Sequence, residues 1–338
     1  MRAVVLARHG GFDALQVHER PAPVCGPGTV RIAVHAAGVT FADTMARVGL
    51  YPDAPPLPAV LGYEVAGEVV ECGPGVRGVA VGDRVMAGTR FGGYAEEVVV
   101  PEHDAIPLPG GLSFPEGAAI PVNYSTAWAA LVDTAGVRPG ERVLVHAAGG
   151  GVGIAATQIA RAEGAEVWGT ASPGKHDEIR AQGVEHAIDY TRRGWDHALP
   201  PFDVVLDAIG GASFRRSYRL LRPGGRLVAY GASATMGGER RDLRRAIPAA
   251  LAMIRGFDLV KQMSDSKTVI GLNMLRLWDD RGTLEPWVTP LRDGLARGAL
   301  RPVVAAAVPF SRAGDGHRIL SERRNIGKVV LVPDGRMG

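Results

Sequence analysis

A glycine-rich stretch is the part of the sequence best suited to bind a phosphate-bearing ligand. It joins a β-branched run that begins at Val143 to an alanine-rich helical pattern. Its glycines match the dinucleotide-binding fingerprint in two registers, residues 151–156 or residues 148–153, the second with alanine in place of the first glycine. One glycine of this fingerprint permits the tight turn, one lets a pyrophosphate touch the backbone, and one lets the helix pack on the strand. A turn without a ligand is the alternative. The flanking strand and helix favour a site formed by Ala148, Gly150, Gly151, Val152 and Gly153.

The residues after the next predicted strand indicate which dinucleotide would bind. NAD-selective turns carry Asp or Glu about 20 residues after the glycines, where it holds the ribose 2′-hydroxyl. Here the strand runs into Ala171 and Ser172, which leave room for a phosphate, and Lys175 adds a positive charge. A lysine at a helix start is as often solvated surface, so Lys175 alone does not discriminate. Together with the missing acid beside Ser172, it predicts NADPH as the cofactor.

Two kinds of hydropathy pattern predict the elements that position these residues. Residues 1–120 contain short Val-rich runs separated by Gly-Pro turns, at 3–7, 29–36, 64–72, 83–87 and 94–100, which predict an all-β, barrel-like domain. From Asn123 onward, strand and helix patterns alternate. The predicted strands are 142–146, 166–170, 187–188, 203–206 and 226–230, and the predicted helices are 152–163, 174–182 and 213–221. Such alternation predicts a parallel sheet with right-handed crossovers, covered on both faces.

The C-terminal part of the sequence is again rich in β patterns. Residues 268–272 predict a further strand, a helix ends near Gly298, and residues 301–308 and 325–332 predict two more strands. Because this character matches the N-terminal part, we expect the tail to fold back onto it. The predicted domains are 1–122, 123–272 and a returning segment at 273–338.

Composition and charge exclude several classes of function. The chain has 338 residues and a net charge of +3. No run reaches the roughly 18 apolar residues of a membrane span, and the N-terminus is too strand-like for a signal peptide. The only cysteines, Cys25 and Cys72, are consistent with a reducing cytosol, where we expect the protein, and exclude a four-cysteine zinc lobe. The basic run at 240–245 lies beside acidic residues, so we expect a solvated helix face and no nucleic-acid partner.

These motifs together resemble the medium-chain dehydrogenase/reductase superfamily, in its zinc-less quinone oxidoreductase branch. The resemblance covers nearly the full length, and its marks are the glycine loop with segments 36–43, 49–51, 62–69, 81–85 and 325–328. Within that branch, segments 41–47, 122–124, 169–172 with 175–176, and 188–190 are most similar to the vesicle amine transport protein-like group. Enoyl reductase domains of polyketide synthases share much of the glycine-loop region. The resemblance implies an α/β fold with a Rossmann doubly wound sheet and a GroES-like β-barrel catalytic domain.

The resemblance also places the sequence apart from the zinc-dependent alcohol dehydrogenases. Those enzymes carry a ligand Cys and a ligand His where this chain has Thr40 and Tyr63. A catalytic zinc needs about three protein ligands, and no such N/S set remains, so we expect no metal. His35, His146 and His176 are interpreted as local hydrogen-bonding residues. Without a Lewis acid, the implied activity is NADPH-dependent reduction of quinones or α,β-unsaturated carbonyls. An NADPH-binding protein with little catalysis is the alternative.

The resemblance places candidate catalytic residues at the rim of the active site. Tyr51 is the first candidate for contact with the acceptor oxygen, or alternatively an interfacial aromatic residue. Thr40 and Asp43 form a polar pair, although Asp43 also fits a helix N-cap. Tyr63 fills the space of the zinc-binding His, as core packing or as a donor, and Asn123 lies at the domain junction.

The resemblance adds cofactor contacts at Tyr190, at Tyr230 with Gly231, and at Asn325, and we also expect contacts at Thr126 and Thr170. Asn325 fits equally well a turn before the last strand. The family pairs sheet edges between subunits at the position of strand 268–273, so a homodimer is expected unless that edge is buried.

Overall fold

The carboxyl-terminal half of the chain is built around a parallel sheet. The structure is a computed structural model that describes residues 1–254 and 258–336. Six strands run in the order β11-β10-β9-β12-β13-β14, and every neighbouring pair is parallel. Their bounds are β9 (Arg142–Val145), β10 (Glu166–Ala171), β11 (His186–Asp189), β12 (Phe202–Asp207), β13 (Leu221–Ala229) and β14 (Thr268–Gly271). This order is that of a doubly wound dinucleotide-binding sheet, as the alternating pattern predicted.

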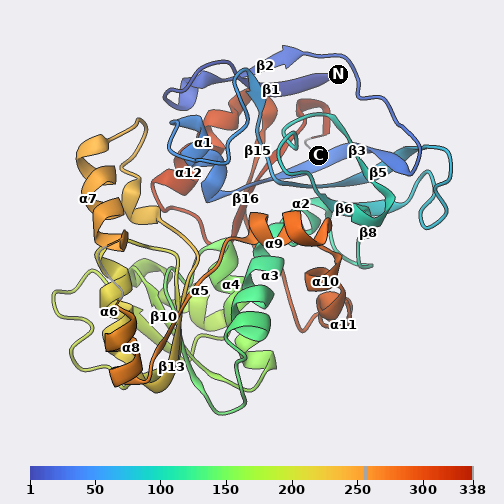
Figure 1. Ribbon diagram of the computed structural model, residues 1–338. Coiled ribbons are helices and arrows are strands. Elements are labelled where there is room, and N and C mark those ends of the chain that lie inside the picture. Colours follow the sequence, from blue (N-terminus) through green and yellow to red (C-terminus); the bar gives the residue numbers. More distant parts are fainter. Residues whose placement is uncertain (255–257, 337–338) are drawn as a thin grey trace.

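Helices cover both faces of this sheet, as Figure 1 shows. On one side lie α3 (Pro121–Trp128), which continues into a π-helical turn, and α4 (Gly151–Ala162). On the other side lies α6 (Ala212–Leu220). The predicted helix 174–182 is instead a 3₁₀ turn at Pro173–Lys175 followed by α5 (His176–Ala181). None of the helices in the described residues is long and apolar enough to cross a membrane.

The N-terminal part forms a β-rich domain that includes the tail of the chain. A seven-stranded sheet has the order β15-β16-β3-β5-β6-β8, with β7 also paired to β3, and a three-stranded sheet has the order β2-β1-β4. The bounds are β1 (Arg2–Leu6), β2 (Leu15–Glu19), β3 (Thr29–Val39), β4 (Ala59–Val60), β5 (Glu64–Cys72), β6 (Arg84–Gly88), β7 (Glu97–Pro101), β8 (Ile106–Pro107), β15 (Val304–Pro309) and β16 (Lys328–Val332). β16 is antiparallel to β3, so the tail of the chain lies beside a strand of the N-terminal part (Figure 1).

The predicted strands 94–100 and 325–332 are shorter than the sequence suggested, because part of each bonds elsewhere. The predicted strand 94–100 begins only at Glu97, since Tyr94 and Glu96 pair with β1 through Val4 N to Tyr94 O (2.8 Å) and Glu96 N to Arg2 O (3.0 Å). The predicted strand 325–332 begins only at Lys328, because the preceding residues cross the glycine loop.

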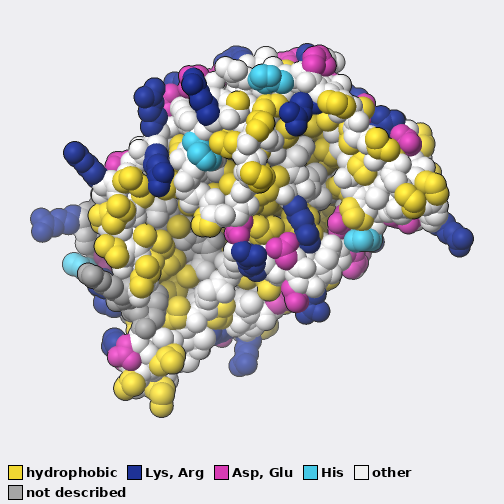
Figure 2. All heavy atoms as spheres, turned by 45° about the horizontal axis from the view of Figure 1, so that its top comes forward, with side chains coloured by type: hydrophobic (Ala, Val, Ile, Leu, Met, Phe, Trp, Pro, Cys, Tyr) yellow, Lys and Arg dark blue, Asp and Glu magenta, His cyan; other side chains and the backbone are white. Residues whose placement is uncertain are grey.

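Further helices pack within each of the two parts or between them. They are α1 (Phe41–Arg47), α2 (Phe114–Gly117), α7 (Leu243–Ile254), α8 (Leu259–Asp265), α9 (Met274–Arg281), α10 (Glu285–Val288), α11 (Arg292–Ala296) and α12 (Ala313–Ser321). α7 exposes an apolar stripe of Leu243, Ile247, Leu251 and Ile254. Hydrophobic side chains gather over α7 in Figure 2, with Lys and Arg side chains around them. Trp278 of α9 and Trp287 of α10 are buried in the same core as the parallel sheet.

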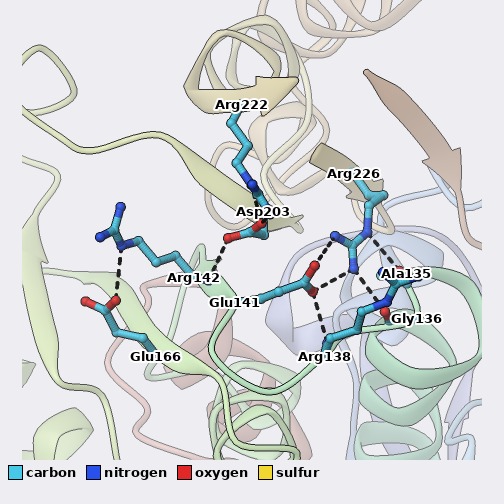
Figure 3. Close-up of polar contacts among 9 residues, drawn as sticks. All are labelled: Ala135, Gly136, Arg138, Glu141, Arg142, Glu166, Asp203, Arg222 and Arg226. Atoms are coloured by element: carbon cyan, nitrogen blue, oxygen red, sulfur yellow. Dashed lines mark hydrogen bonds and ion pairs between the residues drawn. The ribbon is translucent and has the colours of Figure 1, made fainter. Parts of the chain in front are cut away.

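Ion pairs hold the amino ends of the parallel strands in register (Figure 3). Arg226 of β13 binds both carboxylate oxygens of Glu141 at 2.8 Å and also donates to Ala135 O. Asp203 of β12 accepts from the N–H of Arg142 (2.9 Å) and from the Arg222 side chain. Because these contacts occupy the amino ends, the carboxyl ends of the strands remain for a ligand site.

Candidate cofactor and acceptor site

The glycine loop follows the carboxyl end of β9, and its packing selects one of the two possible registers. Gly150 is the N-cap of α4, and Ala147 has a φ of 53°, which turns the chain. A Cβ atom at Gly153 would lie 2.3 Å from Ala147 O, so only glycine lets the helix approach the strand so closely. Gly153 is therefore the third glycine of the fingerprint, and the register is residues 148–153.

The N-terminus of α4 can accept an anion. No side chain caps the helix, and its first intrahelical hydrogen bond runs from Ile154 N to Gly150 O at 2.9 Å. The N–H groups of Gly151, Val152 and Gly153 consequently have no acceptor within the first turn. Together with the helix dipole, they fit a pyrophosphate placed at this turn.

A buried polar network, which the sequence did not reveal, lies next to the start of the glycine loop. His146, the residue after β9, contacts Thr170 Oγ1 at 3.2 Å and Ser217 Oγ at 3.0 Å. Ser217 in turn donates to Asp207 at 2.6 Å. Burial lowers the pKa of His146, which keeps the imidazole neutral. The prediction that His146 is a local hydrogen-bonding residue is confirmed, and its position at the end of the first strand was the available signal.

Thr170 and Thr126 use their hydroxyls within the protein. Thr170 Oγ1 accepts the N–H of Ala147 at 3.2 Å and thereby fixes the turn. Thr126 Oγ1 donates to Val122 O at 2.6 Å within α3. The side chain of Asn123 lies against the glycine loop and donates to Ala119 O at 3.2 Å. Thr170 and Asn123 therefore contact the glycine loop, whereas the Thr126 hydroxyl is engaged within α3.

Lys175 and the tail meet over the same loop. The Lys175 ammonium donates to Arg323 O at 2.7 Å and to Asn325 O at 2.5 Å, so it is not the solvated surface lysine that was the alternative. Burial lowers the pKa of Lys175. Gly327 N donates to Gly149 O at 2.9 Å. An ammonium has three donors, so one remains for a phosphate.

The Asn325 side chain has the conformation of a turn residue. Its Nδ2 donates to Gly327 O at 2.8 Å, two residues further along the chain. This is the alternative that the sequence left open for Asn325, and the side chain helps to hold the tail across the loop.

The other expected cofactor residues also lie near the carboxyl ends of strands. Ser172 follows β10 and is half-buried, and Tyr190 follows β11 and is 38% exposed. Tyr230 follows β13, and burial raises the pKa of its phenol. Gly231 is needed for packing, because a Cβ there would lie 2.6 Å from Ala208 O. Arg192, two residues after Tyr190, is a cation at this edge that sequence reasoning missed.

Thr40 and Asp43 form a capping box at the start of α1. Asp43 Oδ2 accepts from the backbone N–H of Thr40 (2.8 Å) and from its hydroxyl (2.7 Å). The other carboxylate oxygen accepts the N–H of Gly62 at 3.0 Å, and Asp43 is fully buried. The suggestion that Asp43 is the N-cap is wrong, since Thr40 holds that position and Asp43 lies three residues further on. The pair orients α1 and the segment before Tyr63.

Tyr51 and Tyr63 come together with an aromatic residue that the sequence did not single out. The two tyrosine rings are 6.4 Å apart and perpendicular, and Phe91 lies 4.4 Å from the Tyr63 ring. The Tyr63 hydroxyl is buried and forms no well-directed hydrogen bond within the described part of the chain. Burial raises the pKa of Tyr63, and the nearby Tyr51 hydroxyl raises it further, so the phenol stays protonated.

Comparison with known proteins identifies the family. The family model for the alcohol dehydrogenase GroES-like domain matches residues 26–110, and the model for zinc-binding dehydrogenases matches residues 182–331. The chain is 38% identical to the synaptic vesicle membrane protein VAT-1 homolog of Rattus norvegicus, over 98% of this chain and 84% of that protein. The chain belongs to the medium-chain dehydrogenase/reductase superfamily. Within this oxidoreductase superfamily it falls in the zinc-less quinone oxidoreductase and VAT-1-like branch.

Solved structures of superfamily members share the whole architecture. The quinone oxidoreductase from Thermus thermophilus, solved alone and with NADPH, is 35% identical with a TM-score of 0.81, over 98% of this chain and 100% of that chain. The CurK enoyl reductase is 25% identical with a TM-score of 0.84, over 98% of this chain and 99% of that chain.

Thr40 and Tyr63, the residues that we compared with the zinc ligands of the alcohol dehydrogenases, both have structural contacts in this protein. Thr40 caps α1 and Tyr63 packs against Phe91, so both are engaged in local structure. Within residues 1–254 and 258–336, no three His, Cys, Asp or Glu side chains form a group that could hold a metal ion.

Proposed function

We propose that the protein is an NADPH-dependent reductase of quinones or α,β-unsaturated carbonyls that works without a metal. The observation that carries this proposal is the buried Tyr63 hydroxyl, which lacks a well-directed hydrogen bond and lies beside Tyr51 in a core that residues of both domains form. A buried hydroxyl without a well-directed hydrogen bond is costly, so such groups in native proteins call for an explanation. An acceptor oxygen is a partner that would satisfy it.

The glycine loop supports the cofactor half of this proposal. The open N-terminus of α4 would hold the pyrophosphate, and Ser172 with the third donor of Lys175 would hold the 2′-phosphate. When bound, NADPH supplies a hydride: two electrons and a hydrogen pass to the acceptor, NADP⁺ remains, and the reduced acceptor takes up one proton.

The tyrosines support the acceptor half. Both phenols are protonated at neutral pH, because burial raises the pKa of Tyr51 and of Tyr63. Each can therefore donate a hydrogen bond to a carbonyl or quinone oxygen that gains negative charge during reduction. The proton that completes the reduction comes from such a donor or from solvent.

Oxidation of NADPH, followed by its absorbance, tests the proposal against a panel of quinones and enones. We expect turnover with at least one acceptor and a preference for NADPH over NADH. Tight NADPH binding without turnover of any acceptor would overturn the proposal and favour a cofactor-binding protein with little catalysis.

We also propose that two copies of the chain pair in the cytosol through the edge of the parallel sheet. β14 pairs only with β13 among the described strands, which leaves its other edge available for a second copy. Sedimentation of the purified protein tests this, and a monomer at all concentrations would contradict it.

A further inference from the structure

The loop at residues 89–93, which follows β6, has an unusual backbone. Arg90, Phe91 and Gly92 have successive φ values of 50°, 96° and 86°. Glycine adopts such values readily, but phenylalanine does not, because its Cβ clashes with the backbone. Conformations of this kind persist only where the surroundings impose them, and they cluster at functional sites.

Contacts from both parts of the protein impose this conformation. On the β-rich side, Thr89 N donates to Tyr63 O at 2.8 Å and Gly92 N donates to Val60 O at 3.0 Å. On the other side, Arg90 reaches α9, where it pairs with Asp279 at 3.2 Å and lies over the Trp278 ring at 5.2 Å. The loop is therefore fixed between the β-rich domain and the helix that follows the parallel sheet.

The constrained backbone directs the Phe91 ring toward the two tyrosines. Its centroid lies 4.4 Å from that of Tyr63 and 6.4 Å from that of Tyr51. Phe91 and Tyr51 are half-buried, unlike Tyr63, which is buried. We call Tyr51, Tyr63 and Phe91 the aromatic wall.

The same helix also holds the segment that carries Tyr51. Arg276 of α9 binds Asp53 at 2.6 Å, two residues after Tyr51, and its guanidinium is 3.9 Å from Asp279. Two charged residues of α9 thus hold the two loops: Asp279 binds the loop that carries Phe91, and Arg276 binds the segment that carries Tyr51. This explains how two loops from distant parts of the sequence keep their rings in fixed positions.

We propose that Phe91 is a specificity-determining residue and that the aromatic wall selects planar conjugated acceptors, quinones in preference to small aliphatic enones. This inference rests on the proposed function. A planar ring gains edge-to-face or offset stacking against the wall, whereas an aliphatic enone offers no such surface. The strain at Phe91 is retained because it places the ring against that of Tyr63.

Two substitutions remove the ring with different effects on the backbone. Phe91→Gly relieves the strained φ, and Phe91→Ala keeps a Cβ atom in it. For both variants we expect kcat/KM for naphthoquinone to fall about three- to tenfold, mainly through KM. The value for methyl vinyl ketone should stay within about twofold, and the Kd of NADPH should be unchanged.

A matched control is available in the same domain. Phe114 is also half-buried, stacks on His35 at 4.1 Å and lies under the Arg84 guanidinium at 4.6 Å. Phe114→Ala should leave the ratio of the two kcat/KM values unchanged. An equal loss for both acceptors in the Phe91 variants, or no loss for naphthoquinone, overturns the inference.

Binding measurements separate this inference from the proposed function. If the wild-type protein reduces neither acceptor, the proposed function fails. Calorimetric titration of naphthoquinone into the NADP⁺ complex then tests the wall without any turnover. Binding that weakens about three- to tenfold in Phe91→Gly supports the wall. Absent binding, or binding that the substitution does not weaken, overturns it.

Discussion

The amide of Asn123 fills the space that any side chain at Gly151 would need. A Cβ atom at Gly151 would lie 2.3 Å from Asn123 Nδ2. Asn123 belongs to α3 and Gly151 begins α4, so the close approach of these two helices determines which residue can start the helix of the glycine loop. The glycine at this position is thus required by the neighbouring helix.

Gly151→Ala should lower both stability and NADPH affinity. The added methyl group displaces Asn123, and overpacking of this kind costs about 1–3 kcal/mol. Urea unfolding and NADPH titration measure the two effects. Gly149→Ala is the control, because a Cβ there would meet its nearest atom only at 3.5 Å. The double variant Gly151→Ala with Asn123→Ala should recover stability, since the clash is gone, and a lack of recovery would contradict the assignment.

Lys175→Ala should weaken NADPH about tenfold more than NADH, because only NADPH carries the 2′-phosphate that the ammonium would bind. Titration of both cofactors gives the ratio. Lys267→Ala is the matched control, since its ammonium also donates to a backbone carbonyl, that of Tyr218 at 3.2 Å. Equal weakening of both cofactors would show that Lys175 serves only to hold Arg323 and Asn325 of the tail.

Tyr63→Phe should lower activity without lowering stability. Loss of a donor to a developing oxyanion lowers kcat by roughly 10²-fold or more. Removal of a buried hydroxyl that lacks a well-directed hydrogen bond leaves the free energy of unfolding unchanged or raises it. Tyr124→Phe should lower stability with little change in kcat. The Tyr124 hydroxyl donates to Gln158 at 2.7 Å, and loss of this hydrogen bond should cost about 1 kcal/mol of stability. If Tyr63→Phe is as active as the wild type, the phenol is core packing.

His317 should make the protein less stable in acid. Burial and the nearby Arg47 lower the pKa of His317 to about 3, whereas an unfolded histidine titrates near 6.5. Between these values the unfolded chain binds the extra proton, so stability is full above pH 6.5 and falls as the pH decreases toward 3. The loss from this one group between pH 7.5 and pH 5 is about 2 kcal/mol.

Chemical unfolding at several pH values measures this effect. His317→Gln should flatten the acid side of the stability profile, even if the variant loses the contact with Tyr94 and is less stable at neutral pH. His103→Gln, at a side chain that is 61% exposed, should leave the profile unchanged. An unchanged slope in His317→Gln would contradict the assignment.

Local patterns determined much of this protein. The alternation of strand and helix residues after Asn123 predicted the parallel sheet, because each element's period depends only on its own residues. The glycine loop likewise predicted its own turn and helix. The identities of Thr40 and Tyr63 alone were enough to predict that no zinc ligands stand at these two positions.

Only the tertiary structure determined which residues far apart in the sequence contact one another. Two glycine registers were compatible with the sequence until the packing of Gly153 on Ala147 selected one. Lys175 could be free or bound until the tail, about 150 residues away, placed two carbonyls on it. Phe91 gave no local signal, because its role depends on a backbone held by α9 and on rings from two other segments. Hydrogen-bond partners and ring contacts at such separations are set by the packing of whole elements, which no local pattern encodes.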